Sequence, residues 1–180
     1  YDVSFGAFQG GAEYVAVLFM VLAALPFVRF VQLTAGHAAP LFQDGQIRAF
    51  FGTALILVLI LVLWRMGSDG ATGEEAFRKT MFNTVSLITG TGYAIDDYMA
   101  WGSFPITLLF FVGLIGGCAG STACSIKIFR YQLLFASVKV QIQRIHSPNG
   151  VFTPRYEGRA VGPDVLNSVM SFFVFFIVTL

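Results

Sequence analysis

The sequence predicts an all-α polytopic membrane protein built from span–pore-loop–span repeats. Three observations predict this class: the composition, an apolar run close to membrane length, and a short capped helix that leads into a Gly/Thr loop. Hydrophobic residues form 56% and charged residues 12% of the 180 positions, against roughly 45–50% and 25% in ordinary globular domains. One soluble core could not bury this excess, so we expect membrane lipid or neighbouring helices to cover it.

The composition also excludes other classes of protein. A net charge of +1 provides no electrostatic footprint for nucleic acid, so no nucleic-acid partner is expected. The sequence contains no paired catalytic carboxylates, nucleophile–base set or metal cluster, so we predict neither an enzyme nor a covalently bound cofactor. Cys118 and Cys124 are expected to be small, free, buried thiols rather than a zinc site or a disulfide. Because the sequence starts at Tyr1 and ends in an apolar run, we interpret it as an internal piece of a longer polypeptide.

Two membrane spans are expected in the first third of the chain. Residues 13–31 form an apolar run with Pro26 inside it, which membrane helices tolerate because neighbours satisfy the freed carbonyl. Residues 50–64 form the clearest span. Arg48 and Arg65 bracket this span and are expected to reach the two membrane interfaces.

The second half begins with an apolar run at residues 104–115, which a glycine-rich stretch starting at Gly113 interrupts. From Ile126 the pattern becomes amphipathic and basic. Residues 147–163 are a polar connector with three prolines, and a last apolar span starts at Asp164.

Between the spans lies a segment that is typical of a re-entrant pore loop. Thr72 and Glu75 fit a capping box, and the helix predicted over residues 75–87 is too short to cross about 30 Å of hydrocarbon. It leads into the sequence TGTGYA at residues 89–94, which is not helical material. Non-helical backbone at membrane depth occurs only where it is buried in protein or lines a water-filled cavity.

The distribution of charge predicts the orientation. Acidic residues predominate between Gly67 and Phe104. Between Lys127 and Gly162 there are six Lys or Arg residues, and Glu157 is the single acidic residue. The positive-inside rule therefore places residues 127–162 in the cytoplasm and the acidic loops outside. The connectors at residues 34–47 and 145–163 are accordingly expected to be cytoplasmic.

The order of span, short helix, Gly/Thr loop and span predicts a cation pore. Backbone carbonyls from Thr89 to Tyr93 would replace the hydration shell of the ion, glycines reach the unusual backbone angles that this needs, and the C-terminal end of the short helix favours a cation. Asp96 and Asp97 would raise the cation concentration at the outer mouth. The predicted filter residues are Thr89, Gly90, Thr91, Gly92 and Tyr93. Gly92 and Tyr93 match the TVGYG filter of potassium channels, but an external turn between two helices remains an alternative for the loop alone.

Residues 111–130, FVGLIGGCAGSTACSIKIFR, strongly resemble the broken pore-lining helix of the TrkH/KtrB family of potassium uptake proteins. The most specific parts are GGCAGST followed by IKIFR, together with the TGTGY loop upstream. A phosphate-binding P-loop is the competing interpretation of such a glycine-rich stretch, and it fails because no Gly-Lys-Ser/Thr occurs.

The resemblance implies four covalently joined repeats around one pore, with potassium as the transported ion, bound only by filter carbonyls. Residues 1–33 would end the second repeat, residues 48–144 would form the third, and residues 164–180 would begin the fourth. An intramembrane loop beneath the filter would act as a gate. Its residues would be Gly113, Gly116, Gly117, Gly120, Ser121, Thr122 and Lys127.

The resemblance further implies a homodimer in a bacterial-type inner or plasma membrane, associated with a cytosolic nucleotide-binding regulatory subunit similar to TrkA or KtrA. The sequence departs from the family pattern at Ala123-Cys124-Ser125, where a glycine-rich run is usual, and at Gly90, where a hydroxyl residue is common. We therefore expect a stiffer gating loop. Channel-like transport and symport with Na⁺ or H⁺ both remain open.

The alternative function is a non-transporting membrane assembly subunit whose glycines only pack helices closely. Glycines of that kind should lie inside unbroken helices at four-residue spacing. Pore-loop glycines should lie in non-helical backbone.

Overall fold

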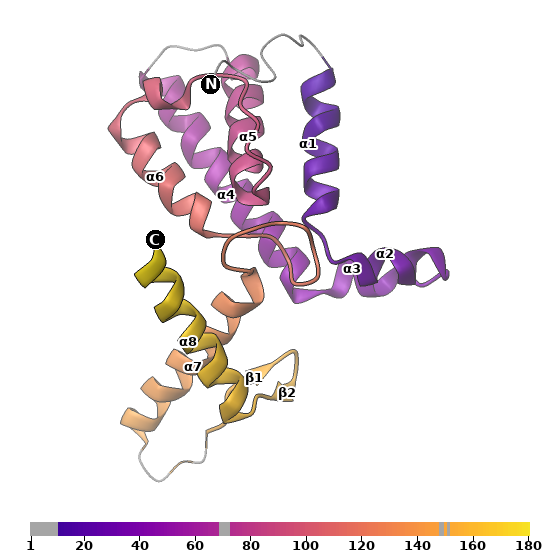
Figure 1. The fold of residues 1–180 in the computed structure, drawn as a ribbon, viewed down its shortest axis with the longest axis vertical. Coiled ribbons are helices and arrows are strands. Elements are labelled where there is room, and N and C mark those ends of the chain that lie inside the picture. The colour runs from indigo at the N-terminus through magenta and orange to yellow at the C-terminus, as the bar shows by residue number, and fades with distance from the viewer. Residues whose placement is uncertain (1–10, 69–72, 148–149, 151) are drawn as a thin grey trace. The chain divides into compact units, whose positions relative to one another are not determined.

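A computed structural model describes residues 11–68, 73–147, 150 and 152–180, and its internal contacts divide the chain into two units that meet at Lys127 and Ile128. Helices dominate both units (Figure 1). The elements of the first unit are α1 (Ala12–Ala23), α2 (Phe27–Thr34), α3 (Ala39–Gln43), α4 (Gly45–Ser68), α5 (Gly73–Thr89), the 3₁₀ helix η1 (Tyr98–Trp101) and α6 (Ser103–Leu114).

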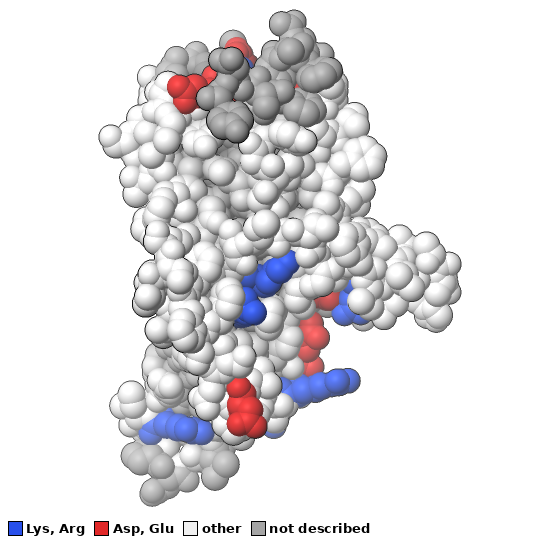
Figure 2. Space-filling view, viewed as in Figure 1, with Lys and Arg blue, Asp and Glu red and all other residues white. Residues whose placement is uncertain are grey.

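The predicted span at residues 50–64 lies within α4, which starts earlier and has 24 residues. In the described part of the chain, α4 is the single helix that is long and apolar enough to cross a membrane by itself, and α6 is a shorter apolar helix. Large apolar side chains of both are exposed, among them Leu55, Leu63 and Phe110. The visible face over these two helices is dominated by uncharged side chains (Figure 2).

The apolar run at residues 13–31 does not form the single helix that we expected. It forms α1 and α2, which meet at an angle of 94°. Proline has no backbone N–H, and it disfavours helical angles at the preceding residue. The chain therefore leaves the helix after Ala24 and restarts at Phe27, with Pro26 in an extended conformation.

The short helix α5 is the centre of the first unit and packs against α1, α4 and α6. It extends two residues beyond the predicted range of 75–87 at each end, and its 17 residues still measure only about 26 Å. Phe82 on α5 is fully buried in a cluster with Val17, Met20, Val85 and Ile95. The predicted capping role of Thr72 lies outside the described residues.

The second unit contains α7 (Ile128–His146), the strands β1 (Arg155–Tyr156) and β2 (Arg159–Ala160), and α8 (Pro163–Thr179). The guanidinium of Arg130 lies 3.5 Å from the ring centroid of Phe172, and the rings of Tyr131 and Phe173 meet edge to face. These contacts join α7 to α8.

The connector at residues 147–163 contains a β-hairpin that the sequence analysis missed. Its strands are antiparallel, and Glu157 and Gly158 between them have φ angles of 49° and 79°. Two consecutive positive φ angles form a type I′ turn, whose twist matches paired strands. The all-α prediction therefore holds for the described residues apart from this hairpin.

Candidate functional site

The helix α5 ends at Thr89, and the segment that follows, residues 90–94, is not helical. We call residues 89–93 the filter loop. Gly90 and Gly92 have φ angles of +72° and +78°, which only glycine adopts at low cost. The N–H of Thr91 donates to the carbonyl of Ser86 at 3.0 Å, so the loop turns back over the end of α5. The break predicted at these glycines is confirmed, and the convergence of their carbonyls on an axis stays a prediction.

Polar contacts with α5 hold the filter loop and the residues that follow it. The N–H of Ile95 donates to Oδ1 of Asn83 at 3.2 Å, and Asn83 is 2% exposed. The hydroxyls of Thr89 and Thr91 form a hydrogen bond of 2.8 Å. Asn83 therefore fixes the segment that leads away from the filter loop.

The two acidic residues of the predicted outer mouth have different surroundings. The carboxylate of Asp96 lies 3.6 Å from both Arg65 and Lys79, whereas Asp97 accepts a hydrogen bond from the N–H of Met99 and caps η1. These two cations offset part of the charge of Asp96. The attraction of cations to the mouth stays a prediction.

Arg65, which we expected at a membrane interface, is buried against other residues of the first unit. It is 7% exposed, and its guanidinium lies 4.2 Å from the ring centroid of Trp101. The aromatic face and the carboxylate of Asp96 stabilise the cation inside the unit. Arg65 therefore packs against neighbouring residues of the unit, and its depth in the membrane stays a prediction.

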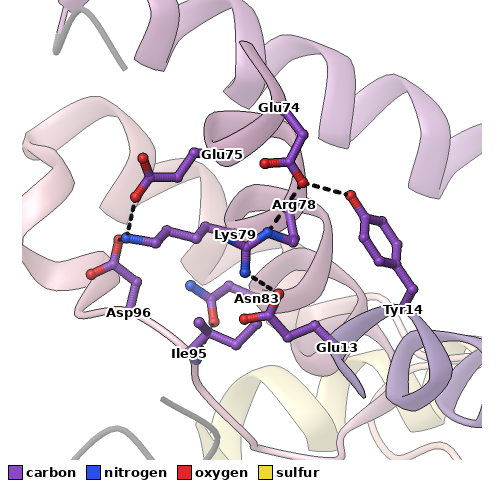
Figure 3. Close-up of polar contacts among 9 residues, drawn as sticks. All are labelled: Glu13, Tyr14, Glu74, Glu75, Arg78, Lys79, Asn83, Ile95 and Asp96. Atoms are coloured by element: carbon purple, nitrogen blue, oxygen red, sulfur yellow. Dashed lines mark hydrogen bonds and ion pairs between the residues drawn. The ribbon is translucent and has the colours of Figure 1, made fainter. Parts of the chain in front are cut away.

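An ion-pair cluster joins the first turns of α5 to α1 (Figure 3). Arg78 of α5 pairs with the buried carboxylate of Glu13 on α1 and with Glu74 at 3.3 Å, and the hydroxyl of Tyr14 donates to Glu74 at 3.1 Å. We call Glu13, Tyr14, Glu74 and Arg78 the α1–α5 clamp. It fixes the N-terminal end of α5 on α1.

On the other side of the same turns, Lys79 pairs with Glu75 at 2.9 Å. The hydrogen bond from Lys79 lowers the pKa of the Glu75 carboxyl, and the same hydrogen bond raises the pKa of Lys79. Both groups therefore remain charged at neutral pH.

Residues 115–127 form a second non-helical segment, which we call the intramembrane loop. Its ends lie side by side, because the N–H of Gly116 donates to the carbonyl of Ile126 at 2.9 Å. Nζ of Lys127 donates to the carbonyls of Ser121 at 3.0 Å and Ala123 at 2.6 Å. The ammonium group of Lys127 thus holds the middle of the loop against its C-terminal end.

The break in helical backbone predicted over residues 116–125 is therefore confirmed. Gly113, included in the predicted gating set, lies within α6, and its carbonyl accepts a hydrogen bond of 2.6 Å from the hydroxyl of Ser125. Ser125 has a φ of 64°, a conformation that favours glycine. The side chain at this position is accommodated by that hydrogen bond.

The intramembrane loop lies directly against the filter loop. A Cβ atom added to Gly90 would lie 3.0 Å from Cβ and 3.2 Å from the backbone nitrogen of Cys124. These are the two places at which the sequence departs from the family pattern, and they touch. The absence of a side chain at Gly90 provides the space that Cys124 occupies.

The sequence analysis missed the residues that receive the intramembrane loop. Thr122 donates to the carbonyl of Ala23 from both its N–H and its hydroxyl, at 3.3 and 3.0 Å, and the N–H of Cys118 donates to the carbonyl of Ala24 at 3.0 Å. The one sequence signal for this contact was Pro26, because a proline can break a helix and leave nearby backbone carbonyls without helical partners.

Both cysteines are free, and Cys118 is buried as predicted, but Cys124 is exposed, so the prediction that it is buried is wrong. Within the described ranges no group of three or more His, Cys, Asp or Glu residues is placed to hold a metal ion. The expectation that the ion binds only to backbone carbonyls stays a prediction.

Comparison with known proteins follows the same segments. A family model for TrkH, described as a cation transport protein, matches residues 3–180. The chain belongs to the TrkH family. The Trk system potassium uptake protein TrkI of Halomonas elongata is 36% identical over 180 residues, which cover 99% of this chain and 36% of that protein. TrkH of Vibrio parahaemolyticus is 31% identical over 96% of this chain and 37% of its own length.

The crystal structure of the potassium transporter TrkH from Vibrio parahaemolyticus superimposes with a TM-score of 0.88 at 30% sequence identity. It covers 97% of this chain and 38% of the TrkH chain. The predicted family and fold class are thereby confirmed. The chain spans little more than a third of the length of these TrkH-family relatives.

Proposed function

We propose that the protein containing this chain transports potassium across a membrane, with the filter loop as one quarter of a carbonyl-lined selectivity filter. One observation carries the proposal: two glycine-rich, non-helical segments, the filter loop and the intramembrane loop, touch at Gly90 and Cys124. The family and the names of its relatives, potassium uptake proteins, support potassium as the transported ion.

The positions of the glycines favour transport over a non-transporting assembly subunit. Packing glycines should lie inside unbroken helices. Gly90, Gly92, Gly116, Gly117 and Gly120 all lie in non-helical backbone. Such backbone is tolerated at membrane depth where it is buried in protein or lines a water-filled cavity.

The intramembrane loop is proposed to be the gate. It lies against the filter loop, and its backbone is held by hydrogen bonds that can exchange with water. The gate would comprise the predicted residues Gly116, Gly117, Gly120, Ser121, Thr122 and Lys127, together with Gly113 at the end of α6. Asp96 and Asp97 would lie at the outer mouth.

The remaining proposals concern the assembly. The apolar surfaces of α4 and α6 suit contact with lipid, in a bacterial-type inner or plasma membrane crossed by several spans. Residues 1–33, 48–144 and 164–180 would belong to three successive repeats, joined by cytoplasmic connectors at 34–47 and 145–163. The proposed partners are a second copy of the protein and a cytosolic nucleotide-binding subunit similar to TrkA or KtrA, which the basic segment after Lys127 would face.

Replacement of Gly92 by Ser tests the filter. The added Cβ meets no atom within 4 Å, so the substitution acts through the φ of +78°, which costs a side-chain residue on the order of 1 kcal/mol or more. We expect the full-length protein in proteoliposomes to retain cation flux but to lose discrimination between K⁺ and Na⁺.

Gly158→Ser is the matched control, because Gly158 has a φ of +79° in the β-hairpin, with open space at its Cβ position. It should leave the K⁺/Na⁺ flux ratio as in the wild type. Equal ratios for wild type, Gly92→Ser and Gly158→Ser would contradict the assignment of the filter.

A further inference from the structure

Backbone hydrogen bonds join the break at Pro26 to the intramembrane loop. They use N–H and carbonyl groups that have no helical partner on either side. In a continuous helix the carbonyls of Ala23 and Ala24 would accept from the N–H groups of residues 27 and 28. Pro26 ends α1 and turns the chain by 94°, which separates these groups.

Residues of the intramembrane loop take the places of the missing partners. The carbonyl of Ala23 accepts from Thr122, and the carbonyl of Ala24 accepts from the N–H of Cys118. In the opposite direction, the N–H of Phe27 donates to the carbonyl of Gly120 at 3.0 Å. The donors and acceptors that the broken helix leaves free are therefore paired with the intramembrane loop. Thr122 and Ala23 are 99 positions apart in the sequence.

Close packing allows this pairing at one glycine in particular. A Cβ added to Gly117 would lie 2.8 Å from the carbonyl oxygen of Ala24 and 2.7 Å from Cβ of Ala123. Ala24 itself is fully buried. A side chain at position 117 would push the loop away from the break.

A second set of contacts supports the same side of the loop. The N–H of Ala119 donates to Oε1 of Gln46 at 2.9 Å, and the N–H of Gln46 donates to Asp44 at 2.8 Å. Asp44 is buried and pairs with Arg29 of α2 at 2.8 Å. The break, α2 and the start of α4 thus form one receiving surface for the loop.

We propose that the Pro26 break is a latch that holds the intramembrane loop in its closed arrangement, with Pro26 as a positioning residue. The proposal rests on the gating role of the loop proposed above. Because Ala24 is fully buried, its carbonyl needs a hydrogen-bond partner, so the loop can leave the break only when water or another group replaces it. Proline keeps the acceptors of Ala23 and Ala24 open for the loop.

Two substitutions in the full-length protein test the latch. Pro26→Ala lets the helix continue, so that its own N–H groups compete for the carbonyls of Ala23 and Ala24. Thr122→Val removes one hydroxyl donor and keeps the shape of the side chain. For each lost hydrogen bond of typical net strength, we expect an increase of about fivefold in the open population. The readouts are K⁺ flux in proteoliposomes and deuterium uptake by the peptide that covers residues 116–124.

Each variant has a matched control. Pro40→Ala replaces a proline in the first turn of α3, and Thr107→Val removes an exposed hydroxyl that bonds only within α6, to the carbonyl of Ser103. Both controls should leave flux and deuterium uptake at wild-type values. If Pro26→Ala fails to fold, Thr122→Val alone decides the outcome.

Deletion of residues 117–123 separates the two proposals. If the deletion raises K⁺ flux while Thr122→Val and folded Pro26→Ala behave like their controls, the loop is a gate but the latch is refuted. If the deletion leaves flux unaltered in a folded protein, the gating role itself is refuted. The latch is supported if Pro26→Ala and Thr122→Val raise K⁺ flux and deuterium uptake while both control variants keep wild-type values.

Discussion

At the scale of single residues, the conformation of the filter loop depends on side chains that lie outside it. Asn83 is buried on α5, and its Oδ1 accepts the N–H of Ile95. This pairing spans twelve positions, and it fixes the point at which the chain leaves the filter loop. We expect the geometry of the filter to depend on it.

Asn83→Leu should therefore impair both stability and selectivity. The substitution leaves the buried N–H of Ile95 without an acceptor, at a cost of roughly 1–3 kcal/mol. We expect a lower apparent melting temperature of the full-length protein and a lower K⁺/Na⁺ flux ratio. Asn83→Asp, which keeps an acceptor oxygen, is the comparison. Identical flux ratios for Leu and Asp would show that Asn83 does not position the filter.

Local chemistry made several of these residues predictable. Gly90 and Gly92 were identified because a loop that departs from helical angles needs residues that tolerate positive φ, and both have it. Lys127, included in the predicted gating set, bonds two carbonyls of the intramembrane loop. The contacts of Arg65 were not predicted, because its partners Trp101 and Asp96 lie more than thirty positions away.

At the scale of elements, the pore helix α5 is held at both ends. The α1–α5 clamp fixes its first turns, and the filter loop folds back on its last turn. Sequence periodicity showed a short helix but not the element against which it packs. The clamp escaped the analysis because its ion pair joins residues 65 positions apart.

Arg78→Ala should destabilise the protein more than Lys79→Ala. Removal of Arg78 leaves the buried carboxylate of Glu13 without its cation, and breaking such a pair costs about 3–5 kcal/mol. Lys79 pairs with Glu75 and Asp96, which are both partly exposed, and solvent screening makes exposed pairs contribute much less than buried ones.

Thermal unfolding of the full-length variants in detergent provides the measurement. The apparent melting temperature should fall clearly for Arg78→Ala and only slightly for Lys79→Ala. Equal small decreases would mean that the clamp does not hold α5 on α1. The two variants are closely matched, because each removes one cationic side chain and the two positions are adjacent on α5.

At the scale of the whole molecule, helical periodicity and turn chemistry were enough to predict the long span, the short helix and the two non-helical breaks in their order along the chain. The span in α4, the short helix α5 and both non-helical breaks lie where the sequence places them. The 94° bend at Pro26 was not predicted, because a proline alone does not distinguish a tolerated kink from a complete break. The latch was hidden for the same reason: its hydrogen bonds join two breaks that are far apart in the sequence.

The β-hairpin after α7 also escaped the analysis. Glu157-Gly158 is a weaker turn signal than Asn-Gly or Asp-Gly, and each strand has only two residues. The flanking prolines favoured an irregular connector. Short strands leave too little alternation in the sequence for a period of two to be recognised.

The central claim is that the filter loop binds the transported ion through its backbone. The most direct test is an anomalous diffraction map of crystals of the full-length protein grown in Rb⁺, which replaces K⁺ and scatters anomalously. We predict peaks on the pore axis, coordinated by carbonyl oxygens of residues 89–93 together with those of the other repeats. Rb⁺ peaks elsewhere, with these carbonyls directed away from the ion path, would contradict the account.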